Sequence, residues 1–245
     1  MTVLPSLLAI DTATDALSLA LQRAGVRRCL HRRLPRQQQQ QLFPALSELL
    51  QGEGPAALGL DALVYGRGPG SFTGLRIAVS AVQGLAFSLD LPVIGLSTLE
   101  TQARTFLRRE AVARPMLILS SLDARIGQLY AACYHYDGSA LHPLSEALLA
   151  EAPQLALPAT ALSLAERLPL VIIGSGASFA DGFAAALRDR LGGIHGDVLP
   201  EAEDMLDPAA ARFLRGEVFA AEAAVPDYVQ TRIGWKTLAE QRRGA

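Results

Sequence analysis

Apolar and polar residues alternate in short stretches near the start of the chain, and this pattern predicts strands. Leu7–Ile10 is an apolar run that ends at Asp11, and after a polar turn leucine recurs at every second position over 17–21. Alternation with period two is typical of a half-buried strand, so the two segments predict a β-hairpin with a polar tip. A third strand is expected over Val26–Leu34.

The apolar spacing then changes to that of a helix. Over Gln37–Gln51 the leucines recur every three or four residues, as on one face of an amphipathic helix. The pattern next predicts, in order, a strand at Ala62–Tyr65, a helix at Phe72–Leu89, a strand at Leu91–Leu96, and a helix capped by Ser97 or Thr98 that ends near Arg109.

The second half of the chain starts with the same order of segments. Apolar Met116–Leu119 leads to Asp123, and the strand Gln128–Tyr136 follows a turn that contains Gly127. Further elements are expected as a strand near Leu141–Leu149, a helix at Ala159–Arg167, a strand at Leu170–Ile173, a helix at Phe179–Leu191 after the Gly174-Ser175-Gly176 turn, and a helix at Pro208–Leu214. The echo indicates two similar lobes and not a fixed-period repeat array.

Two lobes with duplicated βββαβα order, each opened by a hairpin with an aspartate at its turn, resemble the α/β actin, hexokinase and Hsp70 (ASKHA) class. We expect one lobe over residues 1–109, a second over 110–220, and a tail over 221–245 that the pattern does not place. Within the tail, Asp227–Val229 reads as extended and Arg242–Arg243 as a solvated end. A fold of this class serves enzymes and inactive scaffolds alike, so it does not fix function.

Composition and charge limit what the protein can bind and where in the cell we expect it. The 245 residues are 50% hydrophobic, enough for a substantial core, and the net charge of −2 offers no overall attraction for nucleic-acid phosphates. We therefore expect a partner to hold any nucleic acid. The N-terminus is too short and too poor in positive charge for a signal peptide, and no stretch approaches a membrane-spanning length. Free, buried thiols at Cys29 and Cys133 are favoured over a disulfide, which indicates a cytoplasmic protein.

The glycine-rich loop Tyr65–Arg76 carries the most information. It follows a strand and opens a helix, so its glycines allow a sharp turn, and the free amides of the helix N-terminus could bind an anion. The alternative is a tight strand-to-helix connection packed against a partner helix, and the pattern alone leaves both open. The loop is neither a Walker A motif nor a dinucleotide fingerprint.

This loop resembles, nearly residue for residue, the Tyr-Gly-Arg-Gly-Pro-Gly-Ser-Phe-Thr-Gly-x-Arg signature of the TsaB (YeaZ) family. The resemblance covers almost the whole chain, most strongly over residues 7–100 and more weakly over 135–195. Its other matching points lie in the family's order and spacing, at residues 9–14, 83–86, 91–99, 122–130, 200–205 and 226–229.

The resemblance implies a non-catalytic subunit. In this family the protein pairs with a TsaD-like catalytic subunit and works with a TsaE-like ATPase. The complex transfers the threonylcarbamoyl group of threonylcarbamoyl-AMP to adenosine 37 of tRNAs that read ANN codons. It further implies indirect tRNA contact through the complex, a homodimer when the chain is alone, no membrane partner and no tightly bound cofactor, with ATP or ADP as the candidate ligand at the partner interface.

Candidate site residues follow from the loop, the first hairpin and the first-lobe helices. The candidate nucleotide-binding residues are Asp11, Thr12, Gly68, Gly70, Ser71 and Thr73. The candidate partner-interface residues are Gln41, Ala45, Arg76, Val79, Gln83 and Phe87. Two alternatives stay open, because Asp11 could instead accept hydrogen bonds from its own turn amides and the Phe72–Leu89 helix could be wholly buried.

We expect no catalytic residue and no metal ligand in this chain. TsaD-like enzymes ligate a metal through two histidines at i and i+4, whereas the four histidines here are scattered. The corresponding helix begins instead with the glutamine run Gln37–Gln41, where TsaB relatives often have Glu-His-Thr, so its polar contacts are not transferable from the family.

Two rival functions remain open at this stage. An independent kinase of the same fold class would use the hairpins at Asp11 and Asp123, but it needs a general base and two competent phosphate loops. A peptidase would need a Ser-His-Asp, Cys-His or zinc constellation, and none is legible in the sequence.

Overall fold

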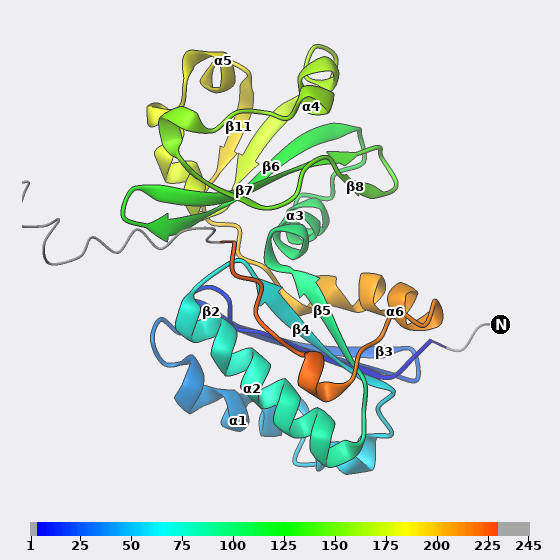
Figure 1. The fold of residues 1–245 in the computed structure, drawn as a ribbon. Coiled ribbons are helices and arrows are strands. Elements are labelled where there is room, and N and C mark those ends of the chain that lie inside the picture. Colours follow the sequence, from blue (N-terminus) through cyan, green and yellow to red (C-terminus); the bar gives the residue numbers. More distant parts are fainter. Residues whose placement is uncertain (1–3, 230–245) are drawn as a thin grey trace, which may run out of the picture.

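The computed structural model describes residues 4–229 and arranges them as two lobes, each built on one mixed sheet (Figure 1). The first sheet has the order β3-β2-β1-β4-β5, in which β1 pairs antiparallel with β2 and parallel with β4. Its strands are β1 (Leu7–Asp11), β2 (Ala16–Arg23), β3 (Val26–Arg33), β4 (Ala62–Gly68) and β5 (Val93–Ser97). The chain is therefore a mixed α/β protein with two sheets.

Both faces of the first sheet are covered by helices. Helices α1 (Gln38–Leu49) and α2 (Phe72–Leu89) pack on the face to which Leu8 and Ile10 contribute. The opposite face, with Leu7 and Ala9, is covered by the 3-10 helix η4 (Ala202–Met205) and helix α6 (Leu206–Leu214). Successive side chains of a strand point to opposite faces, so the apolar run of β1 fits burial on both sides.

The second sheet has the order β11-β10-β6-β7-β8, and β9 pairs separately with β7. Helix α3 (Thr98–Arg109) packs on one face through Leu99, Ala103 and Phe106. The other face holds η3 (Ser175–Gly182) with the short helices α4 (Ala159–Leu164) and α5 (Ala185–Arg188). The strands are β6 (Met116–Arg125), β7 (Gln128–Tyr136), β8 (Leu141–Pro143), β9 (Leu148–Glu151), β10 (Leu170–Ile173) and β11 (Leu191–His195).

The two lobes exchange segments of chain. Helix α3 follows the first sheet in sequence yet packs on the second sheet, and residues 202–214 return from the second sheet to the first. The expected division at residues 109 and 220 differs from this packing at both places. After α6 the chain stays on the first lobe, where Phe219 pairs with Val93, and η5 (Ala221–Ala223) lies beside α2 (Figure 1).

Most predicted elements are present, and several have the predicted ends. Helix α2 spans the predicted residues, and Ser97 caps α3 by accepting a hydrogen bond from the Glu100 amide. The predicted helix Phe179–Leu191 is wrong, because that region holds η3, α5 and the unpredicted strand β11. The predicted strand Leu141–Leu149 is in fact the two short strands β8 and β9. The expected solvated end at Arg242–Arg243 lies outside the described residues.

Helix α2 corrects one expectation about membranes. At 18 residues and a mean hydropathy of 1.3 it is, by length and composition only, long and apolar enough to cross a membrane. In the structure it packs on the first sheet through Ala78, Val79 and Val82, which belong to the core of the first lobe, whereas Phe72 and Phe87 are exposed.

Both cysteines are free thiols, as expected, but they differ in exposure. Cys133 is buried in β7, whereas Cys29 in β3 is exposed and was wrongly expected to be buried. Burial raises the pKa of Cys133 to about 12.

Candidate functional site

A cavity of about 400 Å³ lies between the two lobes. The tips of both hairpins line it, at residues 13–15 and 122–125, together with the start of α2 at residues 70–72. The rest of the wall comes from Arg33, Leu75, Tyr130, Ser175, Gly196, Asp197, Leu199, Asp227 and Tyr228. Of the six candidate nucleotide-binding residues, this wall includes Gly70 and Ser71.

Asp11 is buried at the end of β1 and does not line the cavity. Its side chain is 1% exposed, and its Oδ1 accepts a hydrogen bond from the Ala13 amide at 3.0 Å. Its Oδ2 has no hydrogen-bond partner within residues 4–229 and faces Gly66, where any Cβ would overlap it. This burial raises the pKa of Asp11 to about 6, although the Ala13 hydrogen bond opposes the rise. Asp11 thus accepts from its own turn, which is the alternative that the sequence left open.

The glycine-rich loop is packed directly against this first hairpin. The Thr12 hydroxyl donates to the Gly74 carbonyl at 2.6 Å, and the Ser71 amide donates to the Ala13 carbonyl at 2.7 Å. A Cβ at Gly70 or Gly74 would overlap the carbonyl oxygens of Ala13 and Thr12 respectively. The hairpin therefore presents acceptor oxygens to the loop, and two of the glycines are explained by this close approach.

The start of α2 is capped by the chain itself. The Ser71 hydroxyl accepts from the Gly74 amide at 3.3 Å, while the Thr73 side chain is exposed beyond the cavity wall. Gly68 has a φ of +117° and faces the carbonyl oxygen of Asp227, which would lie 2.8 Å from an added Cβ. The structure thus disperses the candidate nucleotide-binding residues, because Asp11 and Thr12 lie beneath the loop and Gly68 contacts the C-terminal segment.

The second hairpin repeats the arrangement of the first. The Asp123 Oδ1 accepts from the Arg125 amide at 2.8 Å, two residues onward as at Asp11. The Asp123 amide donates to the Ser175 hydroxyl at 2.9 Å, and Gly176 packs against Ser121, whose Cβ would lie 2.7 Å from an added Cβ. In both lobes, a glycine turn that follows a parallel strand is therefore packed against a hairpin.

The cavity carries more negative than positive side chains. Its wall holds four aspartates and two arginines, namely Asp15, Asp123, Asp197, Asp227, Arg33 and Arg125. A cleft lined mainly by one sign of charge attracts the opposite sign. At the rim, Arg67 pairs with Asp227 and Arg76 lies against Phe72 and Tyr228, so the charges of the cavity do not by themselves select a cationic or an anionic ligand.

Residues 221–228, which we name the C-terminal strap, cross α2 toward the cavity (Figure 1). The Gln83 amide side chain donates to the Ala224 carbonyl at 2.8 Å. The Tyr65 hydroxyl accepts from the Val225 amide at 3.2 Å and donates to its carbonyl at 3.4 Å. Burial raises the pKa of Tyr65. Tyr65 and Gln83, both at positions that match the TsaB family, thus hold the strap through its backbone.

The end of the strap is held at the cavity rim. The Asp227 amide donates to the Arg67 carbonyl at 2.6 Å, and their side chains form an ion pair at 3.8 Å. The Tyr228 ring lies 5.6 Å from the Phe72 ring, and the Arg76 guanidinium lies 3.8 Å above the centre of that Phe72 ring. The sequence did not predict these contacts, although residues 226–229 are among the positions that resemble the TsaB family.

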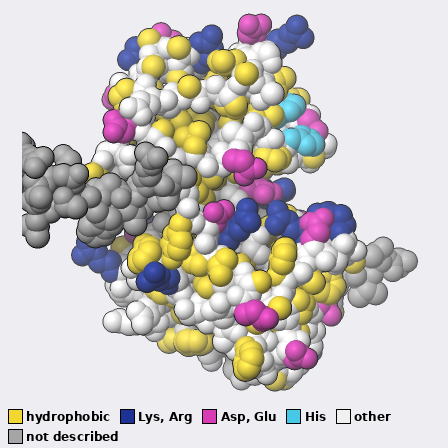
Figure 2. All heavy atoms as spheres, viewed as in Figure 1, with side chains coloured by type: hydrophobic (Ala, Val, Ile, Leu, Met, Phe, Trp, Pro, Cys, Tyr) yellow, Lys and Arg dark blue, Asp and Glu magenta, His cyan; other side chains and the backbone are white. Residues whose placement is uncertain are grey.

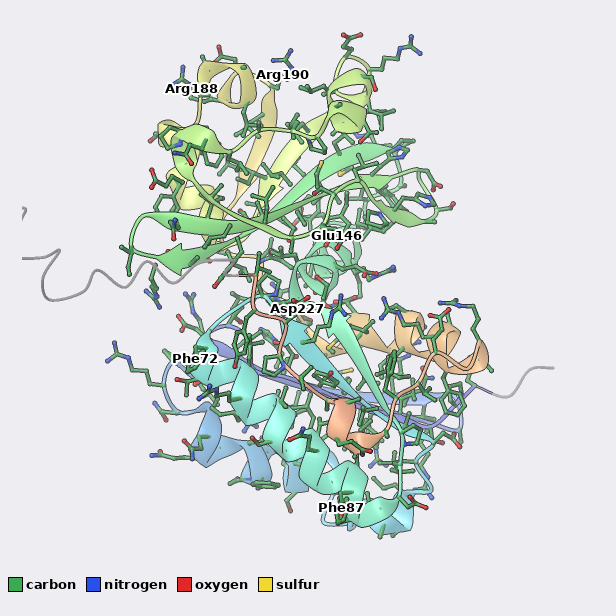
Figure 3. All side chains as sticks on the ribbon, in the orientation of Figure 1. Phe72, Phe87, Glu146, Arg188, Arg190 and Asp227 are labelled. Atoms are coloured by element: carbon green, nitrogen blue, oxygen red, sulfur yellow. The ribbon has the colours of Figure 1, made fainter. Side chains whose placement is uncertain are left out.

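The outward face of α2 is exposed. Its members are Thr73, Arg76, Ser80, Gly84 and Phe87, which recur at helical spacing. Phe87 is 85% exposed near the C-terminal end of the helix, and Phe72 lies at the other end (Figure 3). The helix is therefore not wholly buried, which answers the alternative that the sequence left open.

The other candidate interface residues have different positions. Ala45 and Val79 are buried in the core of the first lobe, so neither offers an exposed contact. Gln41 is half-buried, and Gln83 already binds the strap. In the glutamine run, Gln38 is buried and donates to the Thr14 carbonyl at 2.9 Å, so this run ties α1 to the first hairpin.

Charged side chains concentrate at the junction of the lobes (Figure 2). Arg108 of α3 binds Glu201 at 2.5 Å and Asp204 at 2.8 Å, which links the second lobe's helix to the segment on the first sheet. Among residues 4–229, no group of three or more His, Cys, Asp and Glu side chains is arranged to hold a metal ion. Burial lowers the pKa of His31 near this junction.

Comparison with known proteins gives consistent matches over most of the chain. Residues 32–169 match the family model described as "TsaD: tRNA N6-adenosine threonylcarbamoyltransferase". The tRNA threonylcarbamoyladenosine biosynthesis protein TsaB of Escherichia coli is 36% identical, over 95% of this chain and 97% of that protein. The protein of the same name from Haemophilus influenzae is 29% identical, over 95% and 97%.

Solved structures agree with these matches. The structure titled "YeaZ from Pseudomonas aeruginosa" has a TM-score of 0.79 and 32% identity, over 91% of this chain and 99% of that one. A second Pseudomonas aeruginosa structure, titled an uncharacterized protein with similarity to peptidase YEAZ, has a TM-score of 0.82, 32% identity and coverage of 92% and 100%.

Proposed function

This chain belongs to the TsaB (YeaZ) family of tRNA threonylcarbamoyladenosine biosynthesis proteins, and on that premise we propose that it is a non-catalytic subunit. It pairs with a TsaD-like catalytic subunit and, with a TsaE-like ATPase, supports transfer of the threonylcarbamoyl group from threonylcarbamoyl-AMP to adenosine 37 of tRNAs that read ANN codons. The tRNA is contacted indirectly, through the complex.

The outward face of α2 carries this proposal. It combines the 85%-exposed Phe87 with the small residues Ser80 and Gly84, and the space beside Gly84 is open. An exposed aromatic side chain beside small residues suits close approach of a second helix, because the ring can be buried while the backbones come near each other. The same face supports a homodimer when the chain is alone.

The non-catalytic role is supported by how the hairpins are used. Asp11 and Asp123 accept hydrogen bonds from their own turns, and the glycine turns beside them are filled by hairpin atoms. In the first loop the Ser71 amide donates to the Ala13 carbonyl and the Gly74 amide to the Ser71 hydroxyl, so these two amides are already used within the chain. ATP or ADP would therefore bind at the partner interface, with phosphate ligands from the partner, and not in this cavity.

The fold proposal follows from the same repetition. Two sheets that each begin with a hairpin, an aspartate at the turn and a glycine turn packed against it support the ASKHA class. Free thiols support the cytoplasm as the location of the chain.

Reconstitution tests the proposal. Purified TsaD-like and TsaE-like subunits, ATP, threonylcarbamoyl-AMP and tRNA are assayed for modified adenosine with and without this chain. We expect modification only with the chain present, and none from the chain alone. Modification at an equal rate without the chain contradicts the proposal.

The interface is tested separately by Phe87→Glu. The Phe87 ring is exposed in this chain and becomes buried in the proposed complex. A carboxylate at this position is therefore expected to weaken the affinity for the TsaD-like subunit at least about tenfold in a titration. The matched control is Leu162→Glu, since Leu162 is also exposed on a helix but lies on α4 of the second lobe. Equal affinity for both variants rules out α2 as the contact.

A further inference from the structure

Two of the chain's four histidines are brought together by a hairpin of the second lobe. His135 of β7 is the direct cross-strand partner of His142 of β8, and their ring centres lie 6.2 Å apart. Directly opposed side chains of an antiparallel pair lie on the same face of the sheet. Figure 2 shows histidine side chains gathered at one edge of the second lobe, in the region of β8 in Figure 1. The fold therefore pairs two residues that the sequence left scattered.

The turn of the same hairpin orients one of the two rings. The Nε2 atom of His142 lies 2.8 Å from the Oδ2 atom of Asp137, and because an ionised carboxylate only accepts hydrogen bonds, Nε2 is the donor. The other ring nitrogen of His142, Nδ1, then keeps its lone pair in the neutral ring. Histidines that bind a metal commonly have a carboxylate on the second ring nitrogen, where it fixes the tautomer and the ring orientation.

Asp137 is itself held in place by the backbone of the turn. Its Oδ1 atom accepts hydrogen bonds from the amides of Ser139 and Ala140 and from the Ser139 hydroxyl, each at 2.8 Å. The Ala140 amide, followed by His142 and Ser139, holds the pKa of Asp137 well below its usual range. The carboxylate is therefore ionised wherever the imidazole is neutral, and His142 has a fixed support.

The separation and exposure of the rings suit one shared ion. Two imidazoles on a single Zn²⁺, each bound at about 2.1 Å, have ring centres roughly 5–6 Å apart, so the 6.2 Å pair needs only a small side-chain rotation. The His142 side chain is 51% exposed and His135 is half-buried, so water has access to the pair. The His135 ring has no hydrogen-bond partner among residues 4–229 that a metal would have to displace.

We propose that His135 and His142 together bind one divalent ion of the imidazole-preferring Zn²⁺ class, with Asp137 orienting His142 and water in the remaining coordination positions. Two protein ligands are consistent with the absence, within residues 4–229, of any arrangement of three or more His, Cys, Asp and Glu for a metal. The site is independent of the proposed function, because it lies on the second lobe and not on α2. It replaces the expectation, drawn from sequence spacing, that this chain holds no metal ligand.

Calorimetric titration of Zn²⁺ into the full chain, without an affinity tag, tests the site. We expect one bound ion per chain, and His135→Gln or His142→Gln should weaken binding at least about tenfold because each removes one of two protein ligands. Asp137→Asn, which removes only the orienting carboxylate, should weaken it about tenfold to a hundredfold. A tenfold excess of Mg²⁺, which prefers oxygen ligands, should leave the affinity unchanged.

Two matched variants control for other ligands. His195→Gln alters a histidine that packs against Phe106 and not against a second histidine, so it should leave the affinity unchanged. Cys29→Ser removes the exposed thiol and should also leave it unchanged. In the parent protein, nuclear magnetic resonance of the imidazole nitrogens should show Zn²⁺ shifting the signals of His135 and His142 and not those of His195, a readout that does not depend on how well any variant folds.

Several outcomes overturn the proposal. Zn²⁺ binding that survives both His135→Gln and His142→Gln, or that is lost in Cys29→Ser, places the ion elsewhere. Competition by Mg²⁺ means that carboxylates and not imidazoles are the ligands. No heat of binding together with unshifted imidazole signals means that the Asp137–His142 contact serves only the turn.

Discussion

The buried carboxyl group of Asp11 makes the stability of this protein depend on pH in a predictable direction. Burial raises its pKa from 3.8 to about 6, so folding favours the protonated form. A raised folded-state pKa contributes stability that is full below about pH 4 and is lost as pH rises through about 6. At roughly 1.4 kcal/mol per pH unit, the ionised group costs about 3 kcal/mol near pH 8.

Asp11→Asn removes that cost while keeping the shape and the acceptor for the Ala13 amide. We expect the variant to exceed the parent by up to about 3 kcal/mol in free energy of unfolding at pH 8, and to differ little from it at pH 4. Urea titrations between pH 4 and pH 8 measure both values. Gln40→Asn, at an exposed residue of α1 that does not titrate, is the control and should differ from the parent by the same amount at both pH values.

Two results would refute this reasoning. A difference between Asp11→Asn and the parent that stays constant across the pH range would mean that Asp11 does not titrate on folding. A variant less stable than the parent at pH 8 would mean that the Oδ2 atom has a favourable partner, such as a bound cation, that residues 4–229 do not supply.

Two further predictions concern packing and the lobe junction. Gly74→Ala should lower the free energy of unfolding by about 2–3 kcal/mol, because its Cβ overlaps the hairpin backbone. Gly84→Ala, in open space on the same helix, should raise it by up to about 1 kcal/mol. Thermal unfolding compares the two variants, and equal effects would contradict the packing. Arg108→Ala should cost about 2 kcal/mol by leaving Glu201 and Asp204 without this partner, and hydrogen exchange in α3 should rise; unchanged exchange would mean that the junction does not depend on this pair.

Local patterns predicted the elements that local interactions determine. Helix α2 has the predicted ends because Ser71 caps its start and Asp90, with a φ of +53°, ends it. The prediction failed over residues 179–195, where apolar spacing indicated a helix. There Leu191–His195 pairs with β10, and its two glycines gave no strand signal.

The candidate site was predictable only in part, because its contacts join distant residues. The sequence located the glycine-rich loop, and the open question was what the loop touches. The answer depends on Gly74 meeting Thr12, 62 residues away, and on Tyr65 meeting Val225, 160 residues away. The local spacing of residues does not reveal either contact. The sequence alone therefore could not decide whether the loop binds an anion or packs against another part of the protein.

The exchange of segments between the lobes has a consequence for synthesis of the chain. One face of the first sheet, including Leu7, Val64 and Leu96, is covered by Ala202, Met205 and neighbouring residues that the ribosome adds about a hundred positions after β5. At translation rates of roughly 5–20 residues per second, that apolar face stays uncovered for many seconds in the nascent chain. The first half of this protein is therefore expected to be a chaperone client until α6 has emerged from the exit tunnel.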